Sequence, residues 1–310
     1  MNQFRCRVAV FAFVLPTLAL AAASTEIIFA GPTVAGELEA PPRNETSGIA
    51  ASRQSDDLLW THDDSGGAPA LYAVSTKGEL RGTLQIRGVP SGDWEDISCT
   101  TIDNVPWLVI GDIGDNDARR KLITLYFVAE PSAAELKRSR SLSAEPSARL
   151  HLRFPDGPRD CESLAIDVKE RAVYLLSKRD LVPRLYRASL PAKLSNSSEV
   201  VAEFVGPTPE LARPTGADAF FAALFEKGRA RPCGMDFSPD GSAAVVITYA
   251  DVVVYPRGSD DSWAEAFARA PVRLGAHSLP QAEAVCFSRN GTSIFAASEE
   301  TRQLLRYDRR

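Results

Sequence analysis

A short phrase recurs along this chain at intervals of tens of residues. It consists of an acidic residue followed by small or apolar residues that open a strand. Its copies are Glu45-Thr-Ser-Gly-Ile-Ala, Glu95-Asp-Ile-Ser, Glu162-Ser-Leu-Ala-Ile and Glu283-Ala-Val-Cys-Phe, with an altered fifth copy, Cys233-Gly-Met-Asp-Phe. Repetition at this spacing predicts an array of like structural units. We therefore expect the acids to occupy equivalent places and to converge on one point.

Three further apolar runs follow the phrase in each of the first four units. In the first unit they are Leu58–Thr61, Ala70–Val74 and Leu80–Arg87. The runs have strand length, are rich in β-branched and aromatic residues, and are separated by Gly, Pro, Asp or Asn. Four strands per unit, repeated in a ring, predict an all-β fold, a β-propeller of five four-stranded blades. Six blades remain open if residues 99–160 or 166–232 contain two merged units.

The fifth unit ends one strand short, after Leu304–Tyr307. Glu26–Phe29 precedes the first phrase and belongs to no unit, so we expect this N-terminal strand to close the ring and remove its exposed edges. Two segments interrupt the pattern. Ala129–Pro146 is polar and is predicted to be a surface excursion. Residues 217–227 have apolar positions spaced by three and four, which predicts a short helical insertion, and Gly228 follows as its stop.

Residues 1–23 have the pattern of a signal peptide. Arg5 and Arg7 precede the apolar run Val8–Leu20, and Ala21-Ala-Ala23 supplies small residues for cleavage. The alternative, a membrane anchor, needs a longer apolar core. We expect residues 24–310 to form a single propeller domain that is exported to the periplasm or the extracellular space, with no membrane span.

The charge of the chain limits its partners. The formal net charge is −5, and removing 23 residues that contain two arginines and no acids changes it to −7. An acidic exported chain without a basic stripe argues against nucleic-acid binding. A cation fits better, together with a small-molecule anionic substrate or a partner protein. We expect a monomer.

Four cysteines follow the predicted cleavage site: Cys99, Cys161, Cys233 and Cys286. Export permits disulfides, and Cys161 and Cys233 stand at nearly the same level of consecutive repeats. Buried free thiols that act as small apolar residues are an equal alternative.

Polar residues are expected to gather at one face of the disc. In an antiparallel blade, the start of the first strand and the end of the second lie at the same face. The starts carry the acidic phrases. The ends carry Thr61-His-Asp-Asp-Ser65, Gly111-Asp-Ile-Gly-Asp-Asn116, Ser177-Lys-Arg-Asp180, Tyr249-Ala-Asp251 and Ser298-Glu-Glu300.

Converging carboxylates repel one another and need a proton, a cation or basic partners. Hard oxygen ligands suit Ca²⁺. The predicted metal ligands are Glu45, Glu95, Asp112, Asp115, Glu162 and Glu283. In the loop Asp112–Asn116, Gly114 permits a sharp turn between two acids, although such a loop is also typical of an ordinary tight turn.

Basic and aromatic residues complete the predicted site. Lys178 and Arg179 are candidates for holding an anion, or for neutralising the acids. His62 is a candidate general acid or base, or a histidine paired with a neighbouring acid. We assign these three to catalysis. The candidate substrate contacts are Asp64, Tyr249 and Glu299.

Several phrases together resemble a known group of proteins. They are Glu45-Thr-Ser-Gly-Ile-Ala, Trp60-Thr-His-Asp-Asp-Ser65, Asp93-Trp-Glu-Asp-Ile97, Gly111-Asp-Ile-Gly-Asp-Asn116, Asp160-Cys-Glu-Ser-Leu164, Phe237-Ser-Pro-Asp-Gly241 and Gln281-Ala-Glu-Ala-Val285. The set is similar to bacterial exported β-propeller proteins of a largely uncharacterised family, loosely related to phytase-like and esterase-like propeller domains.

This resemblance implies a Ca²⁺ site around the channel that receives substrate phosphate. It implies that the predicted metal ligands and Glu299 contact metal or substrate, and that Lys178 and Arg179 face the anion. The fourth unit departs from the pattern because Cys233 stands where the other copies have Glu. The sequence therefore predicts a metal-dependent phosphoester or ester hydrolase, with a non-catalytic binding propeller as the alternative. Any ligand is expected off the axis, toward the first three blades.

Overall fold

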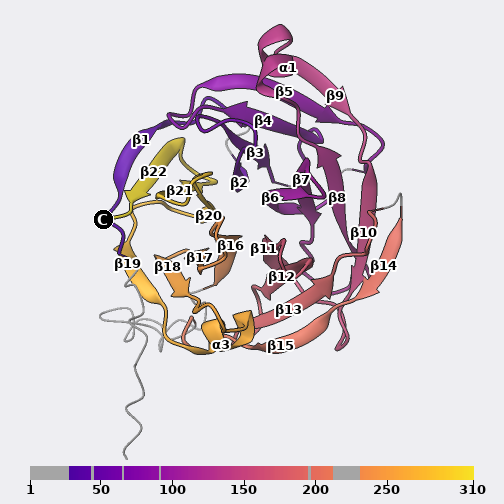
Figure 1. The fold of residues 1–310 in the computed structure, drawn as a ribbon, viewed down its shortest axis with the longest axis vertical. Coiled ribbons are helices and arrows are strands. Elements are labelled where there is room, and N and C mark those ends of the chain that lie inside the picture. The colour runs from indigo at the N-terminus through magenta and orange to yellow at the C-terminus, as the bar shows by residue number, and fades with distance from the viewer. Residues whose placement is uncertain (1–27, 43–44, 65, 91, 195–196, 212–230) are drawn as a thin grey trace, which may run out of the picture.

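Five antiparallel sheets surround a central axis in the computed structural model (Figure 1). It describes residues 28–42, 45–64, 66–90, 92–194, 197–211 and 231–310. The sheets are blade 1, β2 (Thr46–Ala51), β3 (Leu59–Asp63), β4 (Ala70–Val74) and β5 (Leu80–Ile86); blade 2, β6 (Trp94–Ile102), β7 (Val105–Asp112), β8 (Ile123–Ala129) and β10 (Ala148–Arg153); blade 3, β11 (Cys161–Asp167), β12 (Ala172–Ser177), β13 (Arg184–Ser189) and β15 (Glu203–Pro207); blade 4, β16 (Pro232–Phe237), β17 (Ala243–Thr248), β18 (Asp251–Pro256) and β19 (Val272–Ala276); and blade 5, β20 (Ala282–Phe287), β21 (Ser293–Ser298), β22 (Gln303–Asp308) and β1 (Thr33–Glu37). The predicted five-bladed all-β propeller is confirmed.

The N-terminal strand closes the ring as expected, but with different residues. β1 pairs antiparallel with β22, beginning with Thr33 opposite Arg306. Of the predicted segment Glu26–Phe29, residues 26 and 27 lie outside the described residues, and Phe29 makes an isolated antiparallel bridge to Arg309 and packs its ring against Phe287. β1 itself is a half-exposed edge strand and carries little apolar signal.

Two further strands join neighbouring blades. The excursion at 129–146 contains α1 (Ala133–Arg138) and β9 (Ser141–Ala144), and β9 runs parallel to β5 at the outer edge of blade 1. β14 (Ser198–Val201), from the chain of blade 3, runs parallel to β10 of blade 2. The excursion is therefore structured, and each of these strands covers the edge of the preceding blade.

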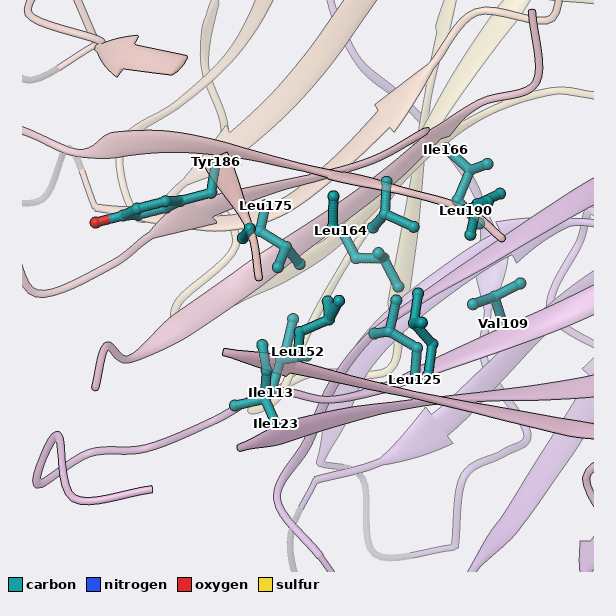
Figure 2. Close-up of a cluster of buried hydrophobic side chains, with 14 of the residues drawn as sticks. Val109, Ile113, Ile123, Leu125, Leu152, Leu164, Ile166, Leu175, Tyr186 and Leu190 are labelled. Carbon is teal, nitrogen blue, oxygen red and sulfur yellow. The ribbon is translucent and has the colours of Figure 1, made fainter. Parts of the chain in front are cut away.

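The core lies between the blades. Five clusters of buried side chains fill the five interfaces, because both faces of each sheet are apolar. In β7, Val109 packs toward blade 3 whereas Leu108 and Ile110 pack toward blade 1, as the period-two alternation of a strand requires. Figure 2 shows the interface of blades 2 and 3, where Leu125 of β8 and Leu164 of β11 lie in the same cluster.

Helix α3 (Trp263–Ala268) is anchored in the core between blades 3 and 4. Ser262 and Glu265 form a capping box at its start. The Trp263 ring stacks on Phe237 with a centroid distance of 3.8 Å. The helical insertion predicted at 217–227 and the signal peptide at 1–23 lie outside the described residues. Within the described ranges, no helix is long and apolar enough to cross a membrane.

The four cysteines Cys99, Cys161, Cys233 and Cys286 are free and buried. Cys161 packs in the interface of blades 2 and 3, and Cys233 packs in that of blades 4 and 5. The two thiols therefore face different interfaces. The alternative of buried free thiols holds, and the disulfide between Cys161 and Cys233 is not formed.

Candidate functional site

The five innermost strands share one irregularity near their starts. In β2, β6, β11, β16 and β20, the register slips by one residue relative to the second strand of the blade. The residue at this bulge has no partner across the ladder. Bulges of this kind bend a strand and aim a side chain in a new direction. One residue from each blade is thus presented at the same level of the channel.

The bulge positions define the ring of residues that the repeated phrase predicted. They are Ser47, Glu95, Glu162, Cys233 and Glu283. The first member corrects the sequence alignment: Ser47, not Glu45, is equivalent to Glu95. Glu45 lies two residues earlier, where its backbone carbonyl accepts a hydrogen bond from the Asp64 backbone at 2.8 Å. Aligning the phrases on Ile49 instead of on the acid would have found this offset.

The residues that follow the second strands form a second ring at the same face. The equivalent positions are Asp64, Ile113, Lys178, Tyr249 and Glu299. The structure therefore brings together seven of the predicted site residues at one mouth of the channel, which we call the acidic mouth: Glu95, Glu162 and Glu283 from the bulges, and Asp64, Lys178, Tyr249 and Glu299 from the strand ends.

Lys178 is buried among acidic groups of blades 3, 4 and 5. Its ammonium contacts Glu162 and lies 3.2 Å from Glu283 Oε1. Burial opposes the charge, but Cys233, Glu162 and Glu283 outweigh this effect and raise the pKa of Lys178. A buried charge without a partner is strongly unfavourable, so the two glutamates and this ammonium neutralise one another.

Tyr249 completes this group. Its hydroxyl donates to Glu283 Oε1 at 2.8 Å, and the Lys178 ammonium lies 5.0 Å from the centre of its ring. Burial raises the pKa of Tyr249, so the hydroxyl stays protonated and acts as a donor. Burial and the carboxylate of Glu283 also raise the pKa of Glu299, to about 9.

A second acidic group lies between blades 1 and 2. One carboxylate oxygen from each of Asp64, Asp93 and Glu95 lies within 4.8 Å of the other two. Ser47 donates its hydroxyl to Glu95 Oε2 at 3.1 Å. Burial raises the pKa of Glu95 well above its ordinary value, and repulsion from Glu162, Asp64 and Asp93 adds to this shift. Burial and Asp64 raise the pKa of Asp93 in the same way.

The loop 112–116 supports this group with its backbone. A Cβ placed on Gly114 would lie 2.5 Å from both Asp93 Oδ2 and Glu95 Oε1. The backbone amides of Ile113 and Gly114 both point to the Asp93 carbonyl, at 3.2 Å. Only glycine permits this approach, because any side chain would fill the space beside the two carboxylates.

The carboxylates of Asp112 and Asp115 are directed into the loop itself. Asp112 Oδ1 accepts from Arg120 at 2.8 Å and from the Asp93 backbone at 3.1 Å. Asp115 accepts from the backbones of Arg119 and Arg120 at 2.9 and 2.7 Å. This is the geometry of a tight turn, the alternative that the sequence left open. The sequence reasoning passed over Asp93, which stands two residues before Glu95 in the same phrase.

Arg179 lies outside the channel, on the rim. Its Nε donates to Asp160 Oδ2 at 2.5 Å, and its guanidinium contacts Asn116 of the neighbouring blade. The side chain is 42% exposed, so it is accessible to a molecule that approaches the acidic mouth.

His62 is placed differently from the rim residues. It is fully buried in β3, its Nδ1 lies 2.9 Å from the Asp63 carbonyl, and its ring packs edge-on against Trp94. Burial lowers the pKa of His62 to about 4, so the ring is neutral at pH 7. A Cβ on Gly48 would lie 2.6 Å from His62 Nε2. The imidazole therefore faces the backbone of β2 and not the solvent of the channel mouth.

Two buried carboxyl groups of the innermost strands link different blades by hydrogen bonds. Asp96 accepts from the backbones of Leu164 and Met235, on blades 3 and 4, at 2.8 and 3.2 Å. Asp236 accepts from the backbone of Phe287, on blade 5, at 2.9 Å. Both acids belong to copies of the repeated phrase, but their role as links between blades depends on contacts that no local pattern reveals.

No family model matches the chain, and no curated protein matches it. Among solved structures, it is similar to a gluconolactonase from Xanthomonas campestris, with 12% identity, 90% of this chain and 89% of that chain covered, and a TM-score of 0.46. It is also similar to the PQQ-bound aldose sugar dehydrogenase from Streptomyces coelicolor, with 11% identity, 90% and 98% covered, and a TM-score of 0.45. The assignment of the propeller rests on the strand pairing of this chain itself.

Proposed function

We propose that the protein is an exported propeller that binds Ca²⁺ at its acidic mouth through Asp64, Asp93 and Glu95, and that it hydrolyses phosphoesters or other esters there. The convergence of three carboxylate oxygens within 4.8 Å carries the proposal. Burial and mutual repulsion raise the pKa of Glu95 and Asp93, so the group is unfavourable when fully ionised without a cation.

The donor set fits a hard cation. Carboxylate oxygens are the ligands that Ca²⁺ prefers, and those of Asp93 and Glu95 pack directly against the backbone of Gly114, with no side chain between them. The other group that could hold a metal ion consists of Glu162, Cys233 and Glu283. Its two glutamates bind the Lys178 ammonium instead. We therefore assign the metal to blades 1 and 2, off the axis of the ring.

The rim supplies a place for an anionic substrate. Arg179 directly follows Lys178 in the chain, and its guanidinium is partly exposed at the rim. Guanidinium groups bind phosphate or carboxylate through paired donors. A bound Ca²⁺ would polarise the ester and lower the pKa of a water molecule. The alternative is a propeller that binds an anionic ligand or a partner protein at this mouth without catalysis.

Thermal unfolding in EDTA and in excess Ca²⁺ tests the metal. A cation that binds only the folded state raises the free energy of unfolding with its concentration, by about 2.7 kcal/mol at one hundred times the dissociation constant. The midpoint temperature of unfolding rises with it. We expect this increase in the wild type and its loss in Asp93→Asn. Asp117→Asn is the matched control, because Asp117 lies in the adjacent loop and pairs with Arg119 at the surface. An equal increase in both variants would remove Asp93 from the site.

Hydrolysis of phosphoester and ester model substrates separates the enzyme from the binding protein. If the protein is an enzyme, activity requires Ca²⁺, is lost in Asp93→Asn and is retained in Asp117→Asn. Ca²⁺ binding without hydrolysis of any substrate class would favour the non-catalytic alternative.

A further inference from the structure

The opposite end of the channel holds a pocket of about 390 Å³. It is formed where the innermost strands of blades 2, 3 and 4 end, and its lining includes Ser98, Thr100, Ile166 and Phe237. Arg53, which follows β2 of blade 1, also lines it. Asp96, at the start of β6, hydrogen-bonds to blades 3 and 4 between the strand starts of the acidic mouth and the strand ends that form this pocket.

Arg53 is held in one orientation. Its backbone amide donates to Glu130 Oε2 at 3.0 Å, and its Nε donates to the Cys99 carbonyl at 2.8 Å. Within the described part of the chain, no hydrogen bond or ion pair engages its two terminal nitrogens. The half-buried guanidinium thus offers a pair of donors to the pocket. Because the side chain is already ordered, a ligand that binds it loses little further side-chain entropy.

The carboxyl groups in the lining are already engaged. Asp236 accepts from the backbones of Phe237 and Phe287, both at 2.9 Å. Asp167 accepts from Arg257 at 2.7 Å and from the Trp263 indole at 2.8 Å. The charge of Arg53 opposes the rise in pKa that burial causes at Asp236 and Glu130, so the guanidinium lies near both carboxyl groups. Its terminal nitrogens nevertheless keep their hydrogen-bonding capacity for a ligand.

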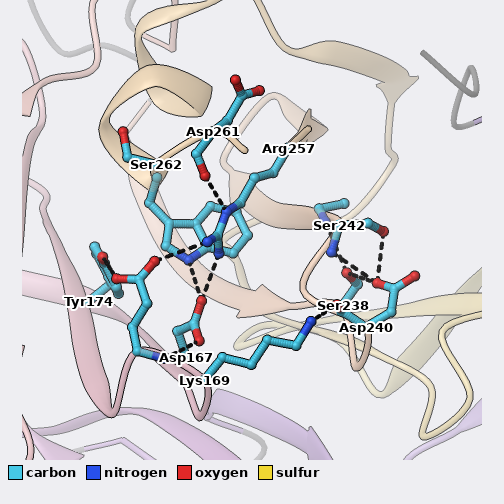
Figure 3. A network of polar contacts seen from close by, with 12 residues as sticks. Asp167, Lys169, Tyr174, Ser238, Asp240, Ser242, Arg257, Asp261 and Ser262 are labelled. Carbon is cyan, nitrogen blue, oxygen red and sulfur yellow. Dashed lines mark hydrogen bonds and ion pairs between the residues drawn. The ribbon is translucent and has the colours of Figure 1, made fainter. Parts of the chain in front are cut away.

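The far wall of the pocket is fixed by a polar network. Figure 3 shows Arg257 and Asp167 in contact, and the Lys169 ammonium against the Asp240 backbone, at 2.9 Å. Lys169 lines the pocket and adds a second positive charge. On the near wall, Ser98 and Thr100 belong to β6 at positions two residues apart, so both hydroxyls face the same side of the strand.

We propose that this pocket binds a small oxyanion, the carboxylate or phosphate group of a small molecule, with Arg53 as its two-donor anchor. Guanidinium groups match the geometry of such oxyanions. The Ser98 and Thr100 hydroxyls supply further donors. The site is distinct from the acidic mouth in position and in charge.

Isothermal titration with inorganic phosphate and with malate tests the proposal. The titrations are done in EDTA, so that no metal at the acidic mouth holds the anion, and at constant ionic strength set with chloride. The wild type is expected to bind at least one of the two anions saturably. Arg53→Gln is expected to weaken binding at least about ten-fold. Thr100→Val, which keeps the shape of the side chain, is expected to weaken it roughly three-fold.

The controls separate this site from the proposed metal site. Arg306→Gln removes a cation that pairs with Asp308 on β22 of blade 5, and it should leave binding unchanged. Asp93→Asn should also bind the anion as the wild type does. The proposal is overturned if neither anion binds the wild type, if folded Arg53→Gln and Thr100→Val both bind with wild-type affinity, or if Asp93→Asn abolishes binding.

Discussion

At the scale of single residues, the acidic mouth is a problem of how buried carboxyl groups are compensated. Glu162 and Glu283 share the ammonium of Lys178. Glu95 accepts the hydroxyl of Ser47. Glu299 has a neighbouring carboxylate, Glu283, and keeps its proton to a high pH. The desolvation of the acids at the mouth is thus offset in three different ways: by a shared ammonium, by a hydroxyl hydrogen bond and by a retained proton.

The pH dependence of stability should report the proton on Glu299. Its pKa is raised from 4.5 to about 9, so the folded protein holds a proton that the unfolded chain releases. This contribution is complete below about pH 4.5 and is lost as the pH rises through 9. In EDTA, we expect the free energy of unfolding to fall between pH 5 and pH 9. Urea denaturation across this range should show a shallower fall for Glu299→Gln, and identical slopes would contradict the assignment.

At the scale of elements, the bulged start of β6, the end of β3 and one loop build the candidate metal site. The bulge at the start of β6 turns Glu95 toward the channel, and the preceding turn brings Asp93 beside it. The loop after β7 is held by Arg120, which donates to the Gly114 carbonyl at 2.7 Å. Asp112 and Asp115 hold the loop in its conformation. Gly114 allows the carboxylates of Asp93 and Glu95 to approach the backbone of the loop.

Gly114→Ala should therefore weaken Ca²⁺ binding without unfolding the blade. The added methyl group would meet Asp93 and Glu95 at 2.5 Å and force their oxygens apart. We expect an affinity loss of about ten-fold or more, because Ca²⁺ needs several oxygens at bonding distance. Isothermal titration with Ca²⁺ measures it. Gly206→Ala is the matched control, since a Cβ there meets no atom within 4 Å. Equal affinities in the two variants would exclude the site beside Gly114.

At the scale of the whole molecule, the ring is held by five apolar interfaces and by one pairing between the two ends of the described chain. β1 lies on the outer edge of blade 5 in Figure 1 and pairs with β22. Asp96 adds hydrogen bonds from blade 2 to blades 3 and 4, and Asp236 adds one from blade 4 to blade 5. β9 comes from the chain of blade 2 and pairs with β5 of blade 1, and β14 comes from the chain of blade 3 and pairs with β10 of blade 2.

Removing β1 should open the ring. A chain that starts at Leu38 exposes the edge of β22, which invites association with other chains. We expect its unfolding midpoint to fall by about 10 °C, the shift that a loss of roughly 3–5 kcal/mol produces in a protein of this size. Light scattering after size-exclusion chromatography should detect oligomers. A chain that starts at residue 28 keeps β1 and should behave as the full chain does. A monodisperse and equally stable shorter chain would show that this pairing does not hold the ring closed.

The fold could be predicted from the sequence because its signals are local. Strand length, alternation of apolar residues and turn residues lie within each run of four to eight positions, and the repeat spacing reveals the number of blades. The closing strand was misplaced because an edge strand such as Thr33–Glu37 is half exposed and weakly patterned. The apolar run before it, in contrast, packs Phe29 against Phe287.

By itself, the sequence determined the five-bladed ring and the gathering of acids at one mouth. Only the tertiary structure decided what each acid does there. Register is set by pairing between strands, so Ser47 and not Glu45 joins the ring. Contacts within blade 2 direct Asp112 into its own loop. Contacts between blades place Lys178 between two glutamates and bring Asp64, Asp93 and Glu95 together. Such contacts join residues far apart in the chain, and a repeated phrase carries no record of them.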